Sequence, residues 1–186
     1  MRIVGGDYRG RRLETPSNDT IRPTTDRTRE ALFNILTNAF AINWRNTRIL
    51  DLFSGTGALG LEALSRGAPF AVFVEQSTQG RGLVRSNIEA LGLTGRTKLF
   101  RRDATRLGAV GTLAPFQLVF ADPPYAKGLG ERAAASLAQG GWMAPSALFV
   151  LEEKRGSLPV TLPDFVALGV RAMGDTEIGI FQYAAG

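Results

Sequence analysis

The chain has neither cysteine nor histidine among its 186 residues. Without cysteine there is no disulfide framework and no thiol nucleophile. Without histidine there is no Ser-His-Asp hydrolysis, and the two absences together exclude a Cys/His zinc site. A magnesium or manganese site made of carboxylates is the metal chemistry left open. Any reaction must therefore proceed without the side chain that most often moves protons near neutral pH.

Long apolar runs are also absent. No stretch approaches the roughly 20 residues that a membrane-spanning helix requires. The first six residues, MRIVGG, lack the apolar segment of a secretory signal. We therefore expect a cytoplasmic protein that does not associate with membranes.

Lysine is scarce: only three of the 22 basic residues are lysines, which leaves 19 arginines against 17 acidic residues and a net charge of +5. The guanidinium group pairs two phosphate oxygens and stacks on bases, so this surplus suits a nucleic-acid partner. Excess positive charge also serves solubility, and a GC-rich genome would produce the same arginine bias. The charge balance alone does not decide between these explanations.

The length fits one domain with an ordinary core. Residues 1–23 lack a helical period and place arginines around glycines and prolines, which predicts a basic β-hairpin extension ahead of a main domain over residues 24–186. Within that domain, apolar spacing predicts helices over 26–40, 58–66 and 77–91. Short apolar runs predict strands over 48–53, 70–75, 97–101, 116–121 and 147–152.

Strands that are apolar on both faces and alternate with helices are typical of a parallel sheet covered on both sides. Near the end of the chain, residues 166–172 and 177–183 flank the turn residues Gly174 and Asp175. This hairpin pattern predicts an antiparallel edge. The expected fold class is α/β, a Rossmann-like, doubly wound and mostly parallel sheet with an antiparallel C-terminal edge.

The segment DLFSGTGALG at residues 51–60 contains G-x-G-x-x-G between a predicted strand and a predicted helix. Gly55 and Gly57 permit a tight turn and a close approach of the backbone to a ligand. Glu75 ends the next strand, where a carboxylate can accept hydrogen bonds from ribose hydroxyls. The pattern predicts cofactor binding, and a merely tight turn between strand and helix is the alternative.

Two carboxylates bear on which cofactor binds. Asp51 precedes the glycines and would lie badly beside a pyrophosphate, but it suits an amino group such as that of the methionine part of S-adenosylmethionine. Asp103 follows the third strand, where it could reach an adenine amino group. Alternatively, Asp103 is a loop aspartate paired with Arg101 or Arg102.

The tetrapeptide DPPY at residues 122–125 follows a buried strand, at the end where open α/β sheets bind ligands. Its prolines stiffen the backbone. The Asp122 carboxylate and the Pro123 carbonyl can accept hydrogen bonds from a planar NH₂ group, and Tyr125 can stack on a base. This set orients an amine for attack on an electrophile by positioning and electrostatics. The alternative is a Pro-Pro turn with an aspartate cap.

Together, these segments resemble the RsmD family of amino-methyltransferases. The resemblance rests on DPPY, Asn87, Glu75 and residues 2–6, 9–13, 22–27, 29–34, 51–60 and 174–176, nearly the whole chain. It implies a class I methyltransferase fold and S-adenosylmethionine-dependent methylation of a guanine N2 in 16S rRNA. One departure is the segment STQGRG at residues 77–82, where two glycines weaken a helix and lead us to doubt its start.

The resemblance also implies roles for individual residues and a partner. The expected cofactor-binding residues are Asp51, Gly55, Gly57, Glu75, Asp103, Ala104 and Arg29, and the catalytic ones are Asp122, Pro123 and Tyr125. The partner would be 16S rRNA, within a 30S subunit or its assembly intermediate, and no metal is expected. Methylation of adenine N6, glutamine N5 or another planar amine stays open, as does a non-catalytic RNA-binding module on the same fold. We expect the N-terminal hairpin to grip RNA, and its loss to spare cofactor binding.

Overall fold

The computed structural model describes residues 1–17, 25–125 and 127–184. It divides into two compact units, the N-terminal unit Met1–Arg101 and the C-terminal unit Arg102–Gly186. This division does not test the expected boundary after residue 23, which stays a prediction. Arg22, Pro23 and Thr24, part of the segment that resembles the RsmD signature, lie outside the described residues.

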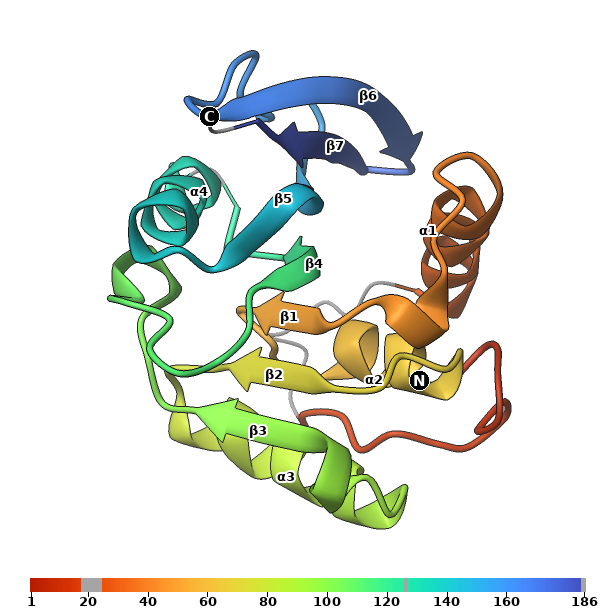
Figure 1. Ribbon diagram of the computed structural model, residues 1–186. Coiled ribbons are helices and arrows are strands. Elements are labelled where there is room, and N and C mark those ends of the chain that lie inside the picture. Colours follow the sequence, from red (N-terminus) through yellow and green to blue (C-terminus); the bar gives the residue numbers. More distant parts are fainter. Residues whose placement is uncertain (18–24, 126, 185–186) are drawn as a thin grey trace. The chain divides into compact units, whose positions relative to one another are not determined.

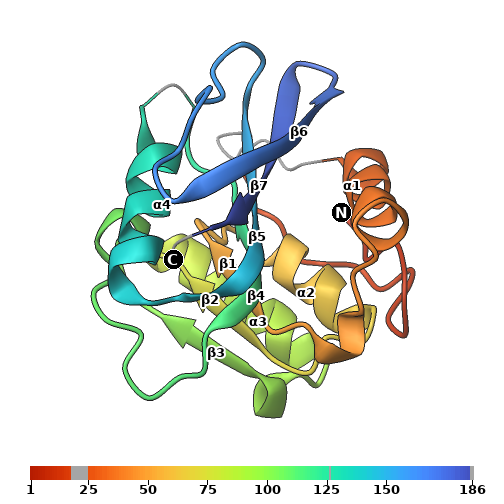
Figure 2. The same ribbon diagram turned by 45° about the horizontal axis from the view of Figure 1, so that its top comes forward.

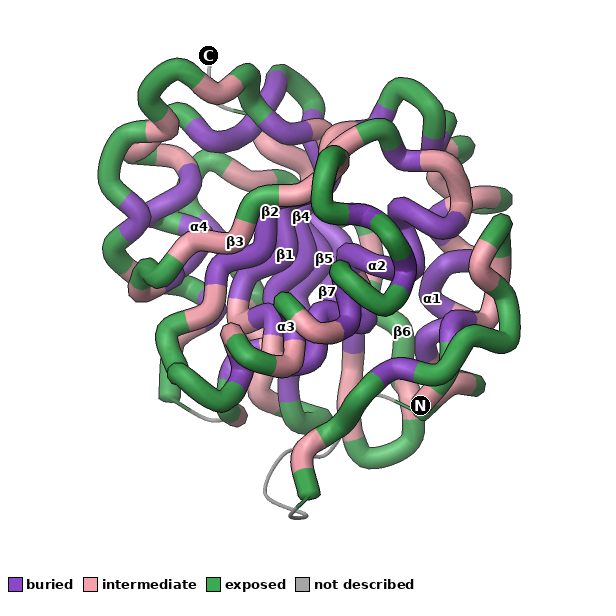
Figure 3. Tube along the Cα trace, turned by 90° about the horizontal axis from the view of Figure 1, so that it is seen from below, coloured by how far each residue is buried: buried purple, intermediate pink, exposed green. Residues whose placement is uncertain are grey.

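The N-terminal unit alternates helices and strands as predicted. Its elements are α1 (Asp26–Asn38), η1 (Trp44–Asn46), β1 (Ile49–Leu52), α2 (Ala58–Ser65), β2 (Ala71–Val74), α3 (Thr78–Ala90), η2 (Thr94–Arg96) and β3 (Thr97–Phe100). The strands pair in parallel in the order β1, β2, β3, side by side in Figure 1. Every residue of β1 and β2 is buried, purple in Figure 3, as their uninterrupted apolar sequences predict.

Local capping explains where the helices begin. The Thr25 hydroxyl accepts a hydrogen bond from the Thr28 N–H and caps α1. The Ser77 hydroxyl accepts one from the Gly80 N–H at 3.0 Å, so α3 begins at Thr78 despite its two glycines. Our doubt about this helix start was therefore wrong. The cap offsets the low helix propensity of glycine.

The N-terminal segment (residues 1–17) folds back on itself with a single antiparallel bridge between Arg2 and Arg12 instead of two strands. The Ile3 N–H donates to the Arg11 carbonyl at 2.9 Å, and the Gly10 N–H donates to the Ile3 carbonyl at 2.8 Å. Ile3 and Leu13 are buried. The predicted hairpin is thus reduced to one bridge, and the two buried apolar side chains fix the segment to its own unit.

The C-terminal unit contains η3 (Ala104–Arg106), β4 (Phe116–Ala121), α4 (Leu129–Gly140), β5 (Met143–Lys154), β6 (Phe165–Met173) and β7 (Thr176–Tyr183). β4 and β5 pair in parallel, whereas β7 is antiparallel to both β5 and β6 (Figure 2). β5 is longer than predicted, and α4 was not predicted at all.

The parallel strands of the N-terminal unit, and the parallel pair and antiparallel edge of the C-terminal unit, confirm the predicted α/β fold class. Over the residues that the structure describes, no helix has both the length and the apolar character needed to cross a membrane.

Candidate functional site

The glycine loop (residues 53–57) joins β1 to α2 and has an unusual backbone. Phe53, Gly55 and Gly57 all lie in the left-handed region, with φ of 53°, 58° and 79°. A Cβ on Gly55 would come no nearer than 3.9 Å to another atom, so the backbone conformation, not lack of space, calls for glycine there. Phe53 has no such freedom, and its conformation costs on the order of 1–3 kcal/mol. Strain of this kind is typical of a ligand-binding loop.

Gly60, the third glycine of the motif, has a different role. A Cβ there would collide with the Phe73 ring and lie 3.1 Å from Asp51 Oδ2. Its absence lets the first turn of α2 pack tightly on the strands, so that the Gly60 N–H donates to Asp51 Oδ2 at 3.0 Å. The motif thus brings a backbone donor to the carboxylate at the end of β1.

Asp51 is only 2% exposed. Burial raises the pKa of its carboxyl group to about 8, because the charged form loses its hydration. The Gly60 hydrogen bond opposes this rise, and the negative charge of Glu75 adds to it. A cationic ligand group would stabilise the ionised form and lower the pKa again. Such a carboxyl group suits an ammonium group as its partner, and the cofactor-binding role of Asp51 stays a prediction.

Glu75 follows β2 and fixes two backbone segments. Its Oε2 accepts a hydrogen bond from the Gly55 N–H at 2.9 Å, and its Oε1 accepts one from the Ser77 N–H at 2.8 Å. A carboxylate has about four lone-pair positions, so it can also accept from ligand hydroxyls. A Cβ on Gly80 would lie 2.7 Å from Glu75 Cδ. Gly80 thus makes room for this carboxylate, a role that the sequence reasoning missed.

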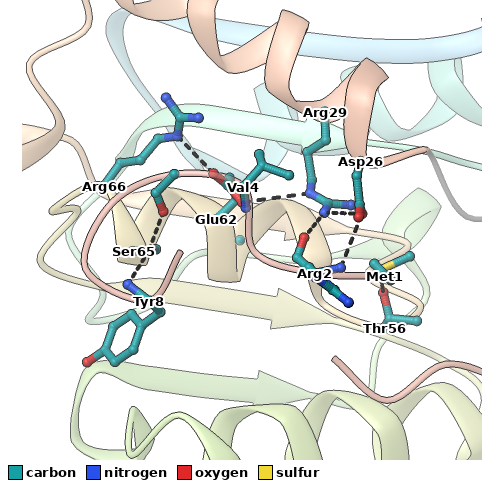
Figure 4. A network of polar contacts seen from close by, with 12 residues as sticks. Met1, Arg2, Val4, Tyr8, Asp26, Arg29, Thr56, Glu62, Ser65 and Arg66 are labelled. Carbon is teal, nitrogen blue, oxygen red and sulfur yellow. Dashed lines mark hydrogen bonds and ion pairs between the residues drawn. The ribbon is translucent and has the colours of Figure 1, made fainter. Parts of the chain in front are cut away.

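Arg29 lies in a buried polar network and is fully inaccessible to solvent (Figure 4). It forms an ion pair with Asp26 at 2.8 Å and donates to the carbonyl of Arg2. Its Nε lies 3.8 Å from Oε2 of Glu62, which is also fully buried. The structure thus shows Arg29 joining α1, α2 and the N-terminal segment, and its cofactor-binding role stays a prediction.

Asn87 is a second residue to which the sequence reasoning assigned no role. It is 1% exposed and hydrogen-bonds both to Glu14 in the N-terminal segment and to the Thr56 carbonyl in the glycine loop. The available signal was an amide at a buried position of a helix that is otherwise apolar on that side. Such a group is rarely buried unless it is hydrogen-bonded.

In the C-terminal unit, Asp103 caps the short helix η3. Its Oδ1 accepts from the Thr105 N–H at 2.9 Å and from the Thr105 hydroxyl at 2.7 Å. These bonds, aided by the positive charges of Arg106 and Arg132, hold the pKa of Asp103 below its usual value. Ala104 is buried in the same turn. The proposed alternative partner Arg102 donates to the Leu107 carbonyl at 2.9 Å.

The DPPY segment (residues 122–125) directly follows the buried strand β4, as predicted. Asp122 and Tyr125 are half-buried, Pro123 is buried and Pro124 is exposed. Among the described residues every peptide bond is trans, and the two proline rings restrict the backbone of this segment, which bends at Pro124. This leaves the Asp122 carboxylate and the Tyr125 ring partly accessible.

The structure thus brings Asp51, Gly55, Gly57 and Glu75 together within the N-terminal unit. In the described part of the chain, no group of three or more histidine, cysteine, aspartate or glutamate residues could hold a metal ion.

Comparison with known proteins identifies the family. A family model described as Conserved hypothetical protein 95 matches residues 1–182. A relative named Ribosomal RNA small subunit methyltransferase D, from Escherichia coli (strain K12), is 36% identical over 187 residues, covering 100% of this chain and 91% of the relative. The chain belongs to the RsmD family. The resemblance seen in the sequence is therefore confirmed.

Other RsmD-family comparisons agree. A relative of the same name from Haemophilus influenzae is 29% identical and covers 98% of this chain and 93% of its own length. The solved structure of yhhF from Escherichia coli matches with a TM-score of 0.84 and 34% identity, over 100% of this chain and 99% of that one. Because the curated relatives are named as methyltransferases, the predicted enzyme class is confirmed.

Proposed function

We propose that this RsmD-family chain transfers a methyl group from S-adenosylmethionine to the exocyclic N2 of a guanine in 16S rRNA. The observation that carries the proposal is the full-length similarity to proteins named as small-subunit rRNA methyltransferases, in a chain that retains DPPY after a buried strand. We further propose that the substrate is assembled into a 30S subunit or an assembly intermediate.

The residues of the N-terminal unit fit S-adenosylmethionine. When bound, this cofactor supplies the methyl group of a sulfonium centre. The buried Asp51 carboxylate, whose pKa burial raises, would pair with the ammonium group of the methionine part. Glu75 would accept hydrogen bonds from the ribose hydroxyls, and the glycine loop permits close approach of its backbone. We propose that Asp103 and Ala104 of the C-terminal unit contact the adenine.

The DPPY segment would hold the target amine. The Asp122 carboxylate would accept a hydrogen bond from one N–H of guanine N2, and the Pro123 carbonyl would accept one from the other N–H. Tyr125 would stack on the base. Two acceptors in the base plane turn the nitrogen lone pair out for attack and stabilise the positive charge that develops on nitrogen. The methylated nitrogen then gives up one proton. None of these steps requires a histidine or a thiol.

The RNA substrate explains the exposed arginines of the N-terminal segment. Arg2, Arg9, Arg11 and Arg12 are exposed, whereas the acidic residues of the segment are Asp7 and Glu14. Guanidinium groups of this kind would contact phosphates and position the RNA without reading its sequence. A guanine in duplex RNA must be flipped out, or must already lie in a loop, to expose its amine.

The test is methyl transfer to 30S subunits and to free 16S rRNA, both purified from a strain that lacks its own enzyme of this type. The product RNA is digested to nucleosides and analysed by mass spectrometry. N2-methylguanosine is expected, formed far more slowly by Asp122→Ala than by the wild-type chain. A methylated adenosine, or a methylated glutamine found by peptide mass spectrometry of the 30S proteins, would assign the DPPY segment to another planar amine. Cofactor binding with no transfer to either RNA would instead favour a non-catalytic module.

A further inference from the structure

The amide of Asn87 joins two segments that are far apart in sequence. Its Oδ1 accepts a hydrogen bond from the Glu14 N–H at 2.7 Å, and its Nδ2 donates to the Glu14 carbonyl at 3.1 Å. The same Nδ2 donates to the Thr56 carbonyl at 3.0 Å. One buried side chain on α3 therefore bonds to both backbone groups of a residue in the N-terminal segment and to the glycine loop.

The peptide that joins Thr56 to Gly57 in the glycine loop is hydrogen-bonded through both of its polar groups. Glu75 holds the Gly55 N–H, and the Gly57 N–H donates to the Ser54 carbonyl at 2.7 Å. Glycine tolerates both signs of φ, so this peptide could turn over if those bonds were lost. Asn87 holds its Thr56 carbonyl from outside the loop and so helps to select one loop conformation. Met1 Sδ provides a second contact, 3.6 Å from the Thr56 hydroxyl oxygen.

The N-terminal segment is itself firmly held on α2 (Figure 4). The Val4 N–H donates to Glu62 Oε2 at 2.9 Å. Ser65 Oγ accepts from the Tyr8 N–H at 3.0 Å and donates to the Gly5 carbonyl at 2.6 Å. Glu14 thus reaches Asn87 from a segment whose earlier residues are already fixed. The bonds to Asn87 connect this fixed segment to the loop.

We propose that Asn87 is a positioning residue for cofactor binding, which orders the glycine loop by tying it to the N-terminal segment. The inference deepens the proposed function and rests on it, since the ligand of the loop is taken to be S-adenosylmethionine. It replaces our expectation that loss of the N-terminal segment spares cofactor binding. By linkage, whatever stabilises the docked segment also tightens cofactor binding, and the reverse holds equally.

The first test uses Asn87→Asp, which keeps the acceptor for the Glu14 N–H and loses both Nδ2 donations. The Kd for S-adenosylmethionine is measured by calorimetry, and kcat and KM for each substrate by methyl transfer to 30S subunits. We expect the Kd and the KM for the cofactor to rise at least about tenfold, because the Thr56 carbonyl loses its donor and faces a carboxyl oxygen instead, with kcat changed less than about twofold.

Thr47→Val is the matched control in the same unit. Thr47 is also buried, and its hydroxyl donates to the Asn43 carbonyl at 2.7 Å. Both variants therefore remove a buried side-chain donor from a backbone carbonyl, but only Asn87 contacts the glycine loop. Thr47→Val is expected to lower the melting temperature and to leave the cofactor Kd at the wild-type value.

Glu14→Pro tests the link from the other end. Proline removes the Glu14 N–H while Asn87 and its bond to Thr56 remain, and Glu14 is exposed, so folding should tolerate the change. We expect a rise of about threefold in the cofactor Kd. Wild-type cofactor affinity in both Asn87→Asp and Glu14→Pro would overturn the inference. Failure of the wild-type chain to bind S-adenosylmethionine would instead overturn the proposed function.

Discussion

The glycine loop and the DPPY segment are held in place by different means. Side chains from outside the loop, Glu75 and Asn87, hydrogen-bond to its backbone, and Asp51 holds the start of α2 that follows it. The DPPY segment gains its stiffness from the rings of Pro123 and Pro124, which belong to the segment itself. The loop depends on its surroundings for its conformation, and the segment carries much of its rigidity in its own covalent structure.

This difference separates two tasks. A loop ordered by many hydrogen bonds can be tuned in affinity by changing any one of them. A rigid carboxylate and carbonyl that meet only one NH₂ group affect transfer chiefly, because their contacts strengthen as charge develops on the amine. Changes around the glycine loop should therefore act on cofactor Kd and KM, and changes in DPPY on kcat.

Asp122→Ala has the largest expected effect. It tests the prediction that changes in the DPPY segment act on kcat and not on the cofactor Kd. Removing one of two acceptors for the amine should lower kcat by roughly 10²–10³, the usual effect of deleting a preorganised group that stabilises charge in the transition state. The Kd for S-adenosylmethionine should remain within about twofold of wild type. Both quantities are measured as above, by methyl transfer to 30S subunits and by calorimetry.

Glu131→Ala is the control for Asp122→Ala, because it removes an exposed carboxylate from the first turn of α4 in the same unit. It should cost less than about 1 kcal/mol of stability and leave transfer intact. Wild-type kcat in Asp122→Ala would remove Asp122 from the mechanism.

Asp51→Asn tests the prediction for the surroundings of the glycine loop. It should weaken cofactor binding and raise the stability of the folded chain. The amide cannot pair with an ammonium group as an ion, so the cofactor Kd should rise by roughly tenfold to a hundredfold. The folded chain no longer has to bury a carboxylate whose pKa burial raises to about 8, so at pH 8 the variant should be the more stable protein. Calorimetric binding and thermal melts measure the two effects.

The stability difference between Asp51→Asn and the wild type should depend on pH in a direction that follows from the raised pKa of Asp51. Between pH 3.8, the ordinary pKa of an aspartate, and about pH 8, folded Asp51 keeps a proton that the unfolded chain releases. The wild-type free energy of unfolding therefore loses the contribution of this group as pH rises through that window. Asp51→Asn lacks this loss, so its stability advantage should grow from pH 5 to pH 8. An advantage that stays constant over this range would mean that Asp51 is already ionised in the free protein.

The sequence predicted the strands, the glycine motif and DPPY because each rests on local patterns. Four buried residues in a row mark β1 and β2, and glycines mark the turn after β1. The sequence patterns did not indicate α4. They also misjudged the start of α3, because helix propensity does not account for the cap that Ser77 provides. Gly80 and Asn87 escaped it because their partners Glu75 and Glu14 are defined only by the folded chain. Long-range hydrogen bonds have no periodic signature.

The double variant Arg9→Gln with Arg12→Gln should weaken RNA binding and change neither the cofactor Kd nor kcat. Both guanidinium groups are exposed on the N-terminal segment. Each lost phosphate contact should reduce the slope of log K against log salt by about 0.7–0.9, and the pair should cost about tenfold in affinity at low salt. Filter binding of 30S subunits over a salt series measures both. Arg155→Gln with Arg171→Gln, which removes two exposed arginines of the C-terminal unit, is the charge-matched control. A slope unchanged from wild type would mean that these two arginines of the N-terminal segment do not contact RNA phosphates.

The two glycines of α3 provide the finest comparison, because they stand two positions apart and differ in what a methyl group would meet. A Cβ on Gly80 would lie 2.7 Å from the Glu75 carboxyl carbon, whereas a Cβ on Gly82 meets nothing within 4 Å. Gly82→Ala should therefore stabilise the chain by about 0.5–1 kcal/mol through helix propensity alone and leave the cofactor Kd unchanged.

Gly80→Ala gains the same propensity but must displace Glu75 from its bonds to the Gly55 and Ser77 N–H groups. We expect that cost to exceed the gain, with a lower melting temperature and a several-fold weaker Kd for S-adenosylmethionine. If both alanines stabilise equally and neither changes the Kd, then Glu75 does not order the glycine loop. The glycine loop would then owe its affinity for the cofactor to its own backbone. In that respect it would resemble the DPPY segment, whose rigidity comes from its own residues.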